Sequence, residues 1–239
     1  MNLPPGEAHL YSEDPARVTG LAGLEALLTP EERRRMLVYR FPRDRQRFLV
    51  ARGLARTALA RYLDLAPAAV RLTSSPHGKP MLDPPAGLHF NLSHTNGLAV
   101  CLIARCEAGV DVEELRPVDG LLDIARSFFA PDEERDLLQL AGDARRDRFF
   151  AYWTLKEAYA KARGEGFAID FRTLRFQLDE GGPPALSLEA GSGPESNHRP
   201  GAWQFLHGRM GKGHLASAAL QTRRGPALSL LQQESVLGH

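Results

Sequence analysis

The sequence predicts an α+β fold in which two similar half-units form a pseudo-dimer. Segments with a helical spacing of apolar residues alternate with short apolar runs bounded by Gly and Pro, as is typical of helices packed on small antiparallel sheets. The helical segments of the first half also resemble those of the second half, which indicates an internal duplication. We expect one active site in the cleft between the two half-units.

The bulk properties are those of a globular chain without a strong overall charge. The 239 residues are 43% hydrophobic and 25% charged with a net charge of +1, so any anion site must be local. The N-terminus lacks the features of a signal peptide, and the run Leu98–Ala104 is far shorter than the roughly 20 residues that span a bilayer. We therefore expect a cytoplasmic protein that binds neither nucleic acid nor membrane. Cys101 and Cys106 match no zinc or redox motif and are expected to be buried thiols.

Helix signals open the first half of the chain. Residues 29–32, Thr-Pro-Glu-Glu, are typical of a helix start, with Thr29 as the N-cap and Glu32 completing a capping box. A second, basic helix is predicted over roughly Asp44–Leu63. Its polar side carries Arg47, Arg52, Arg56 and Arg61.

Short strands are predicted from apolar runs and from alternation. They are expected at Val70–Thr73, Leu88–Leu92, Leu98–Ala104, Gly109–Glu114, Leu174–Leu178, Ala185–Leu188, Trp203–Leu206 and His214–Leu220. Ser93–Gly97 is predicted to be a loop, and Gly191–Gly201, rich in Gly, Ser and Pro, a mobile surface loop. The residues from Thr222 onward receive no assignment.

The duplication is visible without gaps across two helices. Aligning Pro30 with Pro131 gives an offset of 101 (131 − 30), and the same offset aligns Arg47 with Arg148, Phe48 with Phe149 and Leu54 with Leu155. We predict two copies, residues 1–108 and 109–239. This register places Lys156 and Glu157 where the first copy has Ala55 and Arg56. A basic wall would then face an acidic wall across a cleft for a phosphate-rich ligand.

Arg148–Gly164 is predicted to be an amphipathic helix that ends at Gly164. Glu157 and Lys161 lie one turn apart on a face beside the apolar stripe, and Lys156 projects between these two faces. An ordinary exposed ion pair would also explain the spacing. A carboxylate and two ammonium groups beside aromatic side chains suit a metal bound together with a polyphosphate. The apolar stripe consists of Phe149, Tyr152, Leu155, Tyr159 and Ala162.

Strict alternation in Gly109–Glu113 places Asp111 and Glu113 on one face of a strand. With Glu157 they supply three oxygen donors, which suits Mg²⁺. A solvated edge strand is the alternative.

A second group of polar residues follows a turn at Gly78-Lys79-Pro80. Lys79, Ser93 and His94 are donors suited to a phosphate, although His94 could instead cap a loop. Zinc ligation by His89 and His94 lacks further well-spaced ligands.

Taken in order, these motifs resemble the signature of the 4′-phosphopantetheinyl transferases. The resemblance rests on Asn91-Leu92-Ser93-His94, Gly109-Val110-Asp111-Val112-Glu113, Phe128-Phe129-Ala130-Pro131-Asp132-Glu133 and Trp153-Thr154-Leu155-Lys156-Glu157-Ala158 with Lys161. The chain length and the Gly78-Lys79-Pro80 turn resemble the Sfp-type branch, in which two half-units are fused. The resemblance covers about Thr29 to Leu220 and is loose beyond Asp179.

The resemblance implies an Mg²⁺-dependent transfer of 4′-phosphopantetheine from coenzyme A, the co-substrate, to a serine of an apo acyl or peptidyl carrier protein. The reaction would release 3′,5′-ADP and serve fatty acid, polyketide or nonribosomal peptide biosynthesis. Carried over by motif, Asp111, Glu113 and Glu157 would hold the metal. Lys156 and Lys161 would bind phosphates and, with Glu157, form the catalytic set. The remaining coenzyme A-binding residues would be Arg47, Lys79, Pro80, Ser93 and His94.

The serine needs a base, for which we choose Glu157, directly or through water; Glu113 is the rival, and the sequence does not separate the two. Lys161 would stabilise or protonate the leaving oxyanion. Two other functions fit the same residues: a coenzyme A- or nucleotide-binding protein without turnover, and a metal-dependent phosphohydrolase. We expect a monomer, because two half-units already complete one cleft. The sequence leaves open the natural carrier, its pathway and the choice between Mg²⁺ and Mn²⁺.

Overall fold

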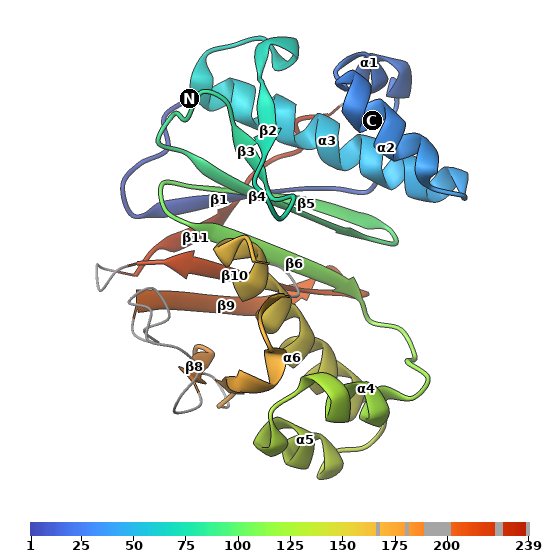
Figure 1. Cartoon of the computed structure of the whole chain (residues 1–239), viewed down its shortest axis with the longest axis vertical. Helices are drawn as coiled ribbons and strands as arrows, with labels where there is room; N and C mark the ends of the chain where they lie inside the picture. Colours follow the sequence, from blue (N-terminus) through green and yellow to red (C-terminus); the bar gives the residue numbers. More distant parts are fainter. Residues whose placement is uncertain (166–167, 180–181, 189–201, 223–226, 238–239) are drawn as a thin grey trace. The chain divides into compact units, whose positions relative to one another are not determined.

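The computed structural model describes residues 1–165, 168–179, 182–188, 202–222 and 227–237. The chain forms two compact units (Figure 1). Unit 1 comprises Met1–Glu107 and Leu228–His239, and unit 2 comprises Ala108–Ala227. The predicted halves placed residues 228–239 in the second half. The structure corrects this, because β11 (Ser229–Gln232) pairs in parallel with β1 (Glu7–Glu13) of unit 1.

Unit 1 packs a long helix on a mixed sheet, in which β1, β5 and β4 are antiparallel and β11 is parallel to β1. The sheet order is β11-β1-β5-β4, and α3 covers β4 and β5. The other elements of unit 1 are α1 (Leu21–Ala26), α2 (Pro30–Val38), α3 (Pro42–Leu63), η1 (Pro67–Ala69), β2 (Leu72–Ser74), β3 (Pro80–Leu82), β4 (His89–Thr95) and β5 (Leu98–Ala104). The capping box at the start of α2 is present: the Glu32 amide donates to the Thr29 hydroxyl at 3.2 Å, and the Thr29 amide donates to the Glu32 carboxylate at 3.0 Å. Cys101 on β5 is fully buried and Cys106 half-buried.

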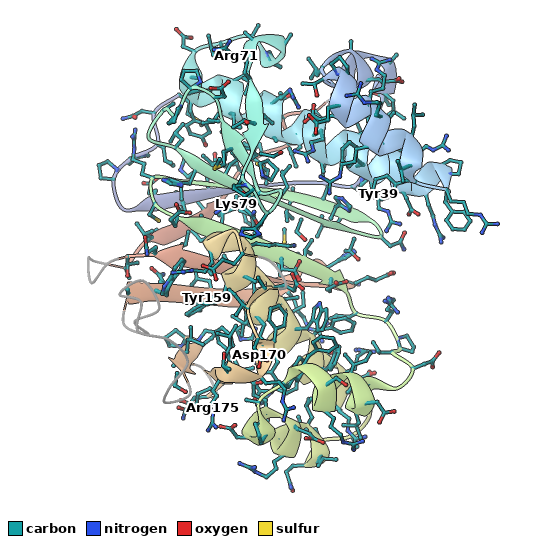
Figure 2. All side chains as sticks on the ribbon, viewed as in Figure 1. Tyr39, Arg71, Lys79, Tyr159, Asp170 and Arg175 are labelled. Atoms are coloured by element: carbon teal, nitrogen blue, oxygen red, sulfur yellow. The ribbon has the colours of Figure 1, made fainter. Side chains whose placement is uncertain are left out.

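Unit 2 has the same plan. Its elements are β6 (Ala108–Glu114), α4 (Leu121–Phe128), α5 (Pro131–Leu138), α6 (Gly142–Arg163), η3 (Phe171–Thr173), β7 (Leu174–Gln177), β8 (Ala185–Leu188), β9 (Trp203–Met210) and β10 (His214–Gln221). The sheet order is β6-β10-β9, with α6 packed on β6 and β10. Tyr159 shows why the predicted stripe of α6 is buried: its ring centroid lies 5.1 Å from that of Trp203 and 6.0 Å from that of Phe205 (Figure 2).

The order of the elements reveals the duplication. Among the described residues, the segments from β1 to β5 and from β6 to β10 have the same order of elements: one strand, three helices, a short 3-10 helix and four strands. The sheets β1-β5-β4 and β6-β10-β9 also have the same strand order. Strand β1 shifted by 101 residues is β6 (7 + 101 = 108, 13 + 101 = 114). The predicted register within the long helices is off by one, because α2 has nine residues and α5 eight. The 22-residue helices α3 and α6 start 100 residues apart (142 − 42).

Most predicted elements are present, and the exceptions have physical reasons. β1 was not predicted, because its Glu, His and Ser residues break the apolar pattern of a buried strand. The strand is buried because it pairs with β5. The loop predicted at Ser93–Gly97 is wrong, since β4 continues to Thr95 in register with β5. The loop predicted at Gly191–Gly201 lies outside the described residues. Among the described helices, none is long and apolar enough to cross a membrane.

Helix α6 comes very close to strand β6 at Gly109. A Cβ atom at this position would lie 2.0 Å from the Ala158 carbonyl oxygen and 2.3 Å from the Ala162 amide nitrogen of α6. Both are backbone atoms, so no side chain can rotate away. Only glycine therefore allows α6 to approach β6 this closely.

Replacing Gly109 by Ala should push α6 away from β6. We expect Gly109→Ala to lower the free energy of unfolding by about 3 kcal/mol, as for an overpacked core. Urea denaturation followed by circular dichroism measures this loss. The matched control is Gly208→Ala on β9, where an added Cβ meets no atom within 4 Å. Equal stability losses in the two variants would contradict the close-contact argument.

Candidate active site

Strand β6 carries a buried carboxylate toward helix α6. Gly109 faces α6, and alternation places Asp111 on the same face two residues later. Asp111 is only 4% exposed. Its Oδ1 lies 2.6 Å from the Lys161 Nζ, so strand and helix are joined by an ion pair. This contact confirms that β6 and α6 bring two of the predicted site residues together.

Glu157 joins this pair from one turn earlier on α6. Burial raises the pKa of Glu157 to about 7, the Lys161 ammonium lowers it, and the Asp111 carboxylate raises it further. Because the Asp111 charge raises the pKa of Glu157, the two carboxylates lie close enough to repel each other. Two carboxylates and one ammonium therefore share one electrostatic site within unit 2.

Glu113 lies two residues beyond Asp111 on β6, so alternation places it on the same face of the strand. Carboxylates are the ligands that Mg²⁺ prefers, and a divalent cation would relieve the repulsion that raises the pKa of Glu157. The donor set thus fits a magnesium ion in kind. Among the described residues, no group of three or more His, Cys, Asp or Glu side chains is arranged as a metal site.

Lys156 lies elsewhere, in the interior of unit 2. Its side chain is 0% exposed, and its ammonium is 2.7 Å from the Glu133 carboxylate. It also donates to the Phe171 carbonyl oxygen at 2.8 Å and to the Leu174 carbonyl oxygen. The sequence prediction that Lys156 binds phosphate does not fit this placement. Its direction was misjudged because a one-residue step on a helix turns the side chain by about 100°.

A second polar contact ties α6 to the sheet near the site. The hydroxyls of Thr154 and Ser217 lie 2.7 Å apart, and both side chains are buried. Ser217 on β10 is directly opposite Asp111 on β6. The helix is thus fixed to both strands at the level of the carboxylates.

In unit 1, Lys79 stands at the turn between β2 and β3, directly before Pro80, the first residue of β3 (Figure 2). Its ammonium lies 3.1 Å from the Glu107 carboxylate, which also lies 3.6 Å from the His89 ring. Burial lowers the pKa of Lys79, and the Glu107 charge raises it. One internal carboxylate therefore faces two groups that could bind an anion.

The other predicted ligand-binding residues of unit 1 lie on α3 and β4. Arg47 pairs with Asp44 on the first turns of α3. Ser93 is buried and His94 half-buried, and both belong to β4 rather than to a loop.

The predicted basic wall on α3 is largely neutralised. Arg56 is 2% exposed and lies 2.8 Å from the Glu32 carboxylate, which is also 3.7 Å from Arg52. Both guanidinium groups are largely shielded from solvent and already face the Glu32 carboxylate, so neither offers an open cationic surface to a ligand. Spacing does not predict these ion pairs, because Glu32 also completes the capping box of α2 and lies far from both arginines in the sequence.

Two family models match adjoining parts of the chain. The model of the 4′-phosphopantetheinyl transferase superfamily matches residues 107–219, and that of the N-terminal part of 4′-phosphopantetheinyl transferases matches residues 16–107. A solved holo-(acyl-carrier-protein) synthase from Bacillus anthracis is also similar. It covers 49% of this chain and 96% of that chain, with a TM-score of 0.40 and 21% identity.

Two curated relatives extend across both units. The 4′-phosphopantetheinyl transferase HetI of Nostoc sp. is 40% identical over 62% of this chain, and the match spans 64% of HetI, just under two thirds. The 4′-phosphopantetheinyl transferase psf-1 of Bacillus pumilus is 31% identical over 69% of this chain and 70% of that protein. The chain belongs to the 4′-phosphopantetheinyl transferase superfamily. The family predicted from the sequence is therefore confirmed.

Two acidic partners are not evident from the sequence. Glu133 stands within a family motif, but its contact with Lys156 is tertiary. Glu107 stands in none of the motifs, although it contacts Lys79. Only Glu133 has a sequence position that could have indicated its role. It is the third residue of α5, and a glutamate at this position turns back toward the start of the helix, where neighbouring elements also meet.

The raised pKa of Glu157 predicts how stability of the metal-free transferase depends on pH. A carboxyl with a pKa of about 7 when folded keeps a proton that the unfolded chain loses near its ordinary value, about 4.3. The contribution of Glu157 to stability is therefore fully present below its unfolded-state pKa of about 4.3 and is lost as the pH rises through its folded-state pKa of about 7. Glu157→Gln cannot ionise, so its stability relative to the wild type should increase between about pH 5 and pH 8.

Urea denaturation in the presence of a chelator, at a series of pH values, measures this difference. The control is Asp143→Asn, because the Asp143 side chain is 85% exposed at the start of α6. Its stability relative to the wild type should show no comparable rise. A Glu157→Gln difference that stays constant with pH would contradict the described electrostatics.

Proposed function

We propose that this transferase moves the 4′-phosphopantetheine moiety of coenzyme A to a serine of an apo acyl or peptidyl carrier protein and releases 3′,5′-ADP. The observation that supports this proposal most strongly is the meeting of Asp111, Glu157 and Lys161 at β6 and α6. These groups lie inside the region matched by the superfamily model. We also propose that the protein acts as a cytoplasmic monomer, without nucleic acid or membrane partners.

The reaction needs one proton acceptor and one group for the leaving charge. The serine oxygen forms a bond to the phosphorus that carries pantetheine, and the pyrophosphate P–O bond breaks. In our proposal the serine proton passes to the Glu157 carboxylate, directly or through water, because this carboxylate shares one site with Asp111 and Lys161. Glu113, on the same face of β6 as Asp111, is the rival base. Lys161 stabilises the oxyanion of the departing 3′,5′-ADP.

The carboxylates of Asp111, Glu113 and Glu157 would hold Mg²⁺. When bound, the metal would neutralise charge on the pyrophosphate. Lys161 already places a positive charge 2.6 Å from Asp111 and lowers the pKa of Glu157, so the chain itself offsets part of the repulsion between these two carboxylates.

Unit 1 would hold the nucleotide end of coenzyme A. We propose Arg47, Lys79, Pro80, Ser93 and His94 for this role, with Lys79 as the main anion-binding group. A phosphate would compete with the Glu107 carboxylate for the Lys79 ammonium, since the two are 3.1 Å apart in the ligand-free protein.

One assay tests the proposed function. The protein is incubated with Mg²⁺, coenzyme A and an apo carrier protein, and the carrier is weighed by mass spectrometry. We expect a phosphopantetheine adduct, no adduct with a chelator, and a loss of rate of at least about 100-fold in Glu157→Gln, as for a general base.

Asp143→Asn is the matched acid-to-amide control on the same helix and should retain the wild-type rate. The wild type failing on fatty-acid, polyketide and peptide carriers would contradict the proposal. Phosphate release from coenzyme A without a carrier would indicate a phosphohydrolase, and coenzyme A binding without either reaction would indicate a binding protein.

A further inference from the structure

The ion pair of Lys156 and Glu133 is buried on the side of α6 that faces α5 and β7. Glu133 is 2% exposed and Lys156 0% exposed. The Glu133 carboxylate also accepts from the Ala130 amide at 2.8 Å and from the Phe176 amide at 2.8 Å. Through this one carboxylate, the start of α5, strand β7 and helix α6 are tied to one another.

The hydrogen-bonding capacity of the Lys156 ammonium is fully used. An ammonium has three donors, and three acceptors surround this one: the Glu133 carboxylate and the carbonyl oxygens of Phe171 and Leu174. The rings of Phe129 and Phe176 flank it, with centroids 5.5 and 5.9 Å from Nζ. No donor remains for a phosphate, and no solvent reaches the group.

Unit 1 contains the same arrangement in a place without the acidic site. Glu32 is the third residue of α2, as Glu133 is the third residue of α5. Arg56 is the fifteenth residue of α3 (56 − 42 + 1), as Lys156 is the fifteenth of α6 (156 − 142 + 1). Each glutamate pairs with a buried cation at this position. A contact repeated in both copies belongs to the architecture of the fold rather than to the chemistry of one copy.

Helix geometry separates this pair from the reacting groups. At about 100° per residue, Lys156 lies about 140° around α6 from Lys161. Lys161 points to Asp111 on β6, whereas Lys156 points to Glu133 and β7. A rotation of α6 about its axis would therefore disturb both contacts together.

We infer that Lys156 and Glu133 are positioning residues: their buried pair fixes the rotation of α6 so that Glu157 and Lys161 meet Asp111. Lys156 itself touches neither coenzyme A nor the reacting phosphate. This inference rests on the proposed transferase function, and it replaces the phosphate-binding role that the sequence motif implied for Lys156.

The test compares Lys156→Met, Glu133→Gln and the double variant at a temperature at which circular dichroism shows all of them folded. Lys156→Met leaves a buried carboxylate without its partner, so we expect a lower Tm and a loss of kcat of at least about tenfold. The Kd for coenzyme A, measured by calorimetry, should change by less than about threefold. The double variant removes both charges and keeps an acceptor at position 133, so it should recover most of the Tm and part of kcat.

The matched control is Arg56→Met, which breaks the equivalent pair in unit 1. It should lower the Tm while kcat of the folded protein stays within about twofold of the wild type, because no group proposed to act on the reacting phosphate lies on α3. An equal loss of kcat in Arg56→Met and Lys156→Met would overturn the inference, since it would indicate general loosening.

Two further results would also overturn it. The Kd for coenzyme A could rise about tenfold in Lys156→Met and stay raised in the double variant with a restored Tm, as expected of a phosphate ligand. Alternatively, Lys156→Met could lower the Tm and keep the wild-type kcat, as expected of a purely stabilising residue. A wild type that transfers nothing would instead contradict the proposed function, and the inference with it.

Discussion

The contact of helix α6 with strand β6 is the constraint on which the candidate active site depends. Gly109 has no side chain, so backbone atoms of Ala158 and Ala162 come within the space that a Cβ would fill. This approach sets Asp111 opposite the helix two residues later and allows an ion pair of 2.6 Å with Lys161. The site is thus a consequence of how one strand and one helix pack.

One side of α6 carries the residues of the candidate active site, and another side anchors the helix within unit 2. Glu157 and Lys161 face the carboxylate of β6, and Thr154 is bonded to Ser217 of β10. Lys156 is held on another side by Glu133 and two carbonyl oxygens. A buried ion pair is weak support for stability in itself, yet breaking it leaves a costly unpaired charge, which makes it a sensitive device for fixing a helix.

The two copies differ at the acidic site and agree at the buried glutamate–cation pair. In the register of the strands, Asp111 and Glu113 correspond to Leu10 and Ser12 of β1. In the register of the helices, Glu157 corresponds to Thr57. The buried glutamate–cation pair is kept in both copies, because it serves the packing that they share. Both units therefore have the packing contact, and unit 2 has the acidic residues.

The fold was largely predictable because local signals and burial agree along most of the chain. The capping box at Thr29, the stripe of α6 and the alternation of β6 each have a single interpretation. Strand β1 was not predictable, since polar residues form it and its burial is tertiary. Spacing alone pairs Asp111 with Glu113 on the strand and Glu157 with Lys161 on the helix. The contact between strand and helix, the direction of Lys156 and the neutralisation of Arg56 could not be predicted in this way, because each depends on a partner that is distant in the sequence.

The central claim is that Asp111 and Glu157 serve one divalent cation. Binding of Mn²⁺, used as a paramagnetic substitute for Mg²⁺, can be followed by electron paramagnetic resonance in the presence of coenzyme A. The account predicts one bound ion in the wild type and a loss of affinity of at least about tenfold in both Asp111→Asn and Glu157→Gln, because each removes a charged ligand. Wild-type affinity in either folded variant would contradict it.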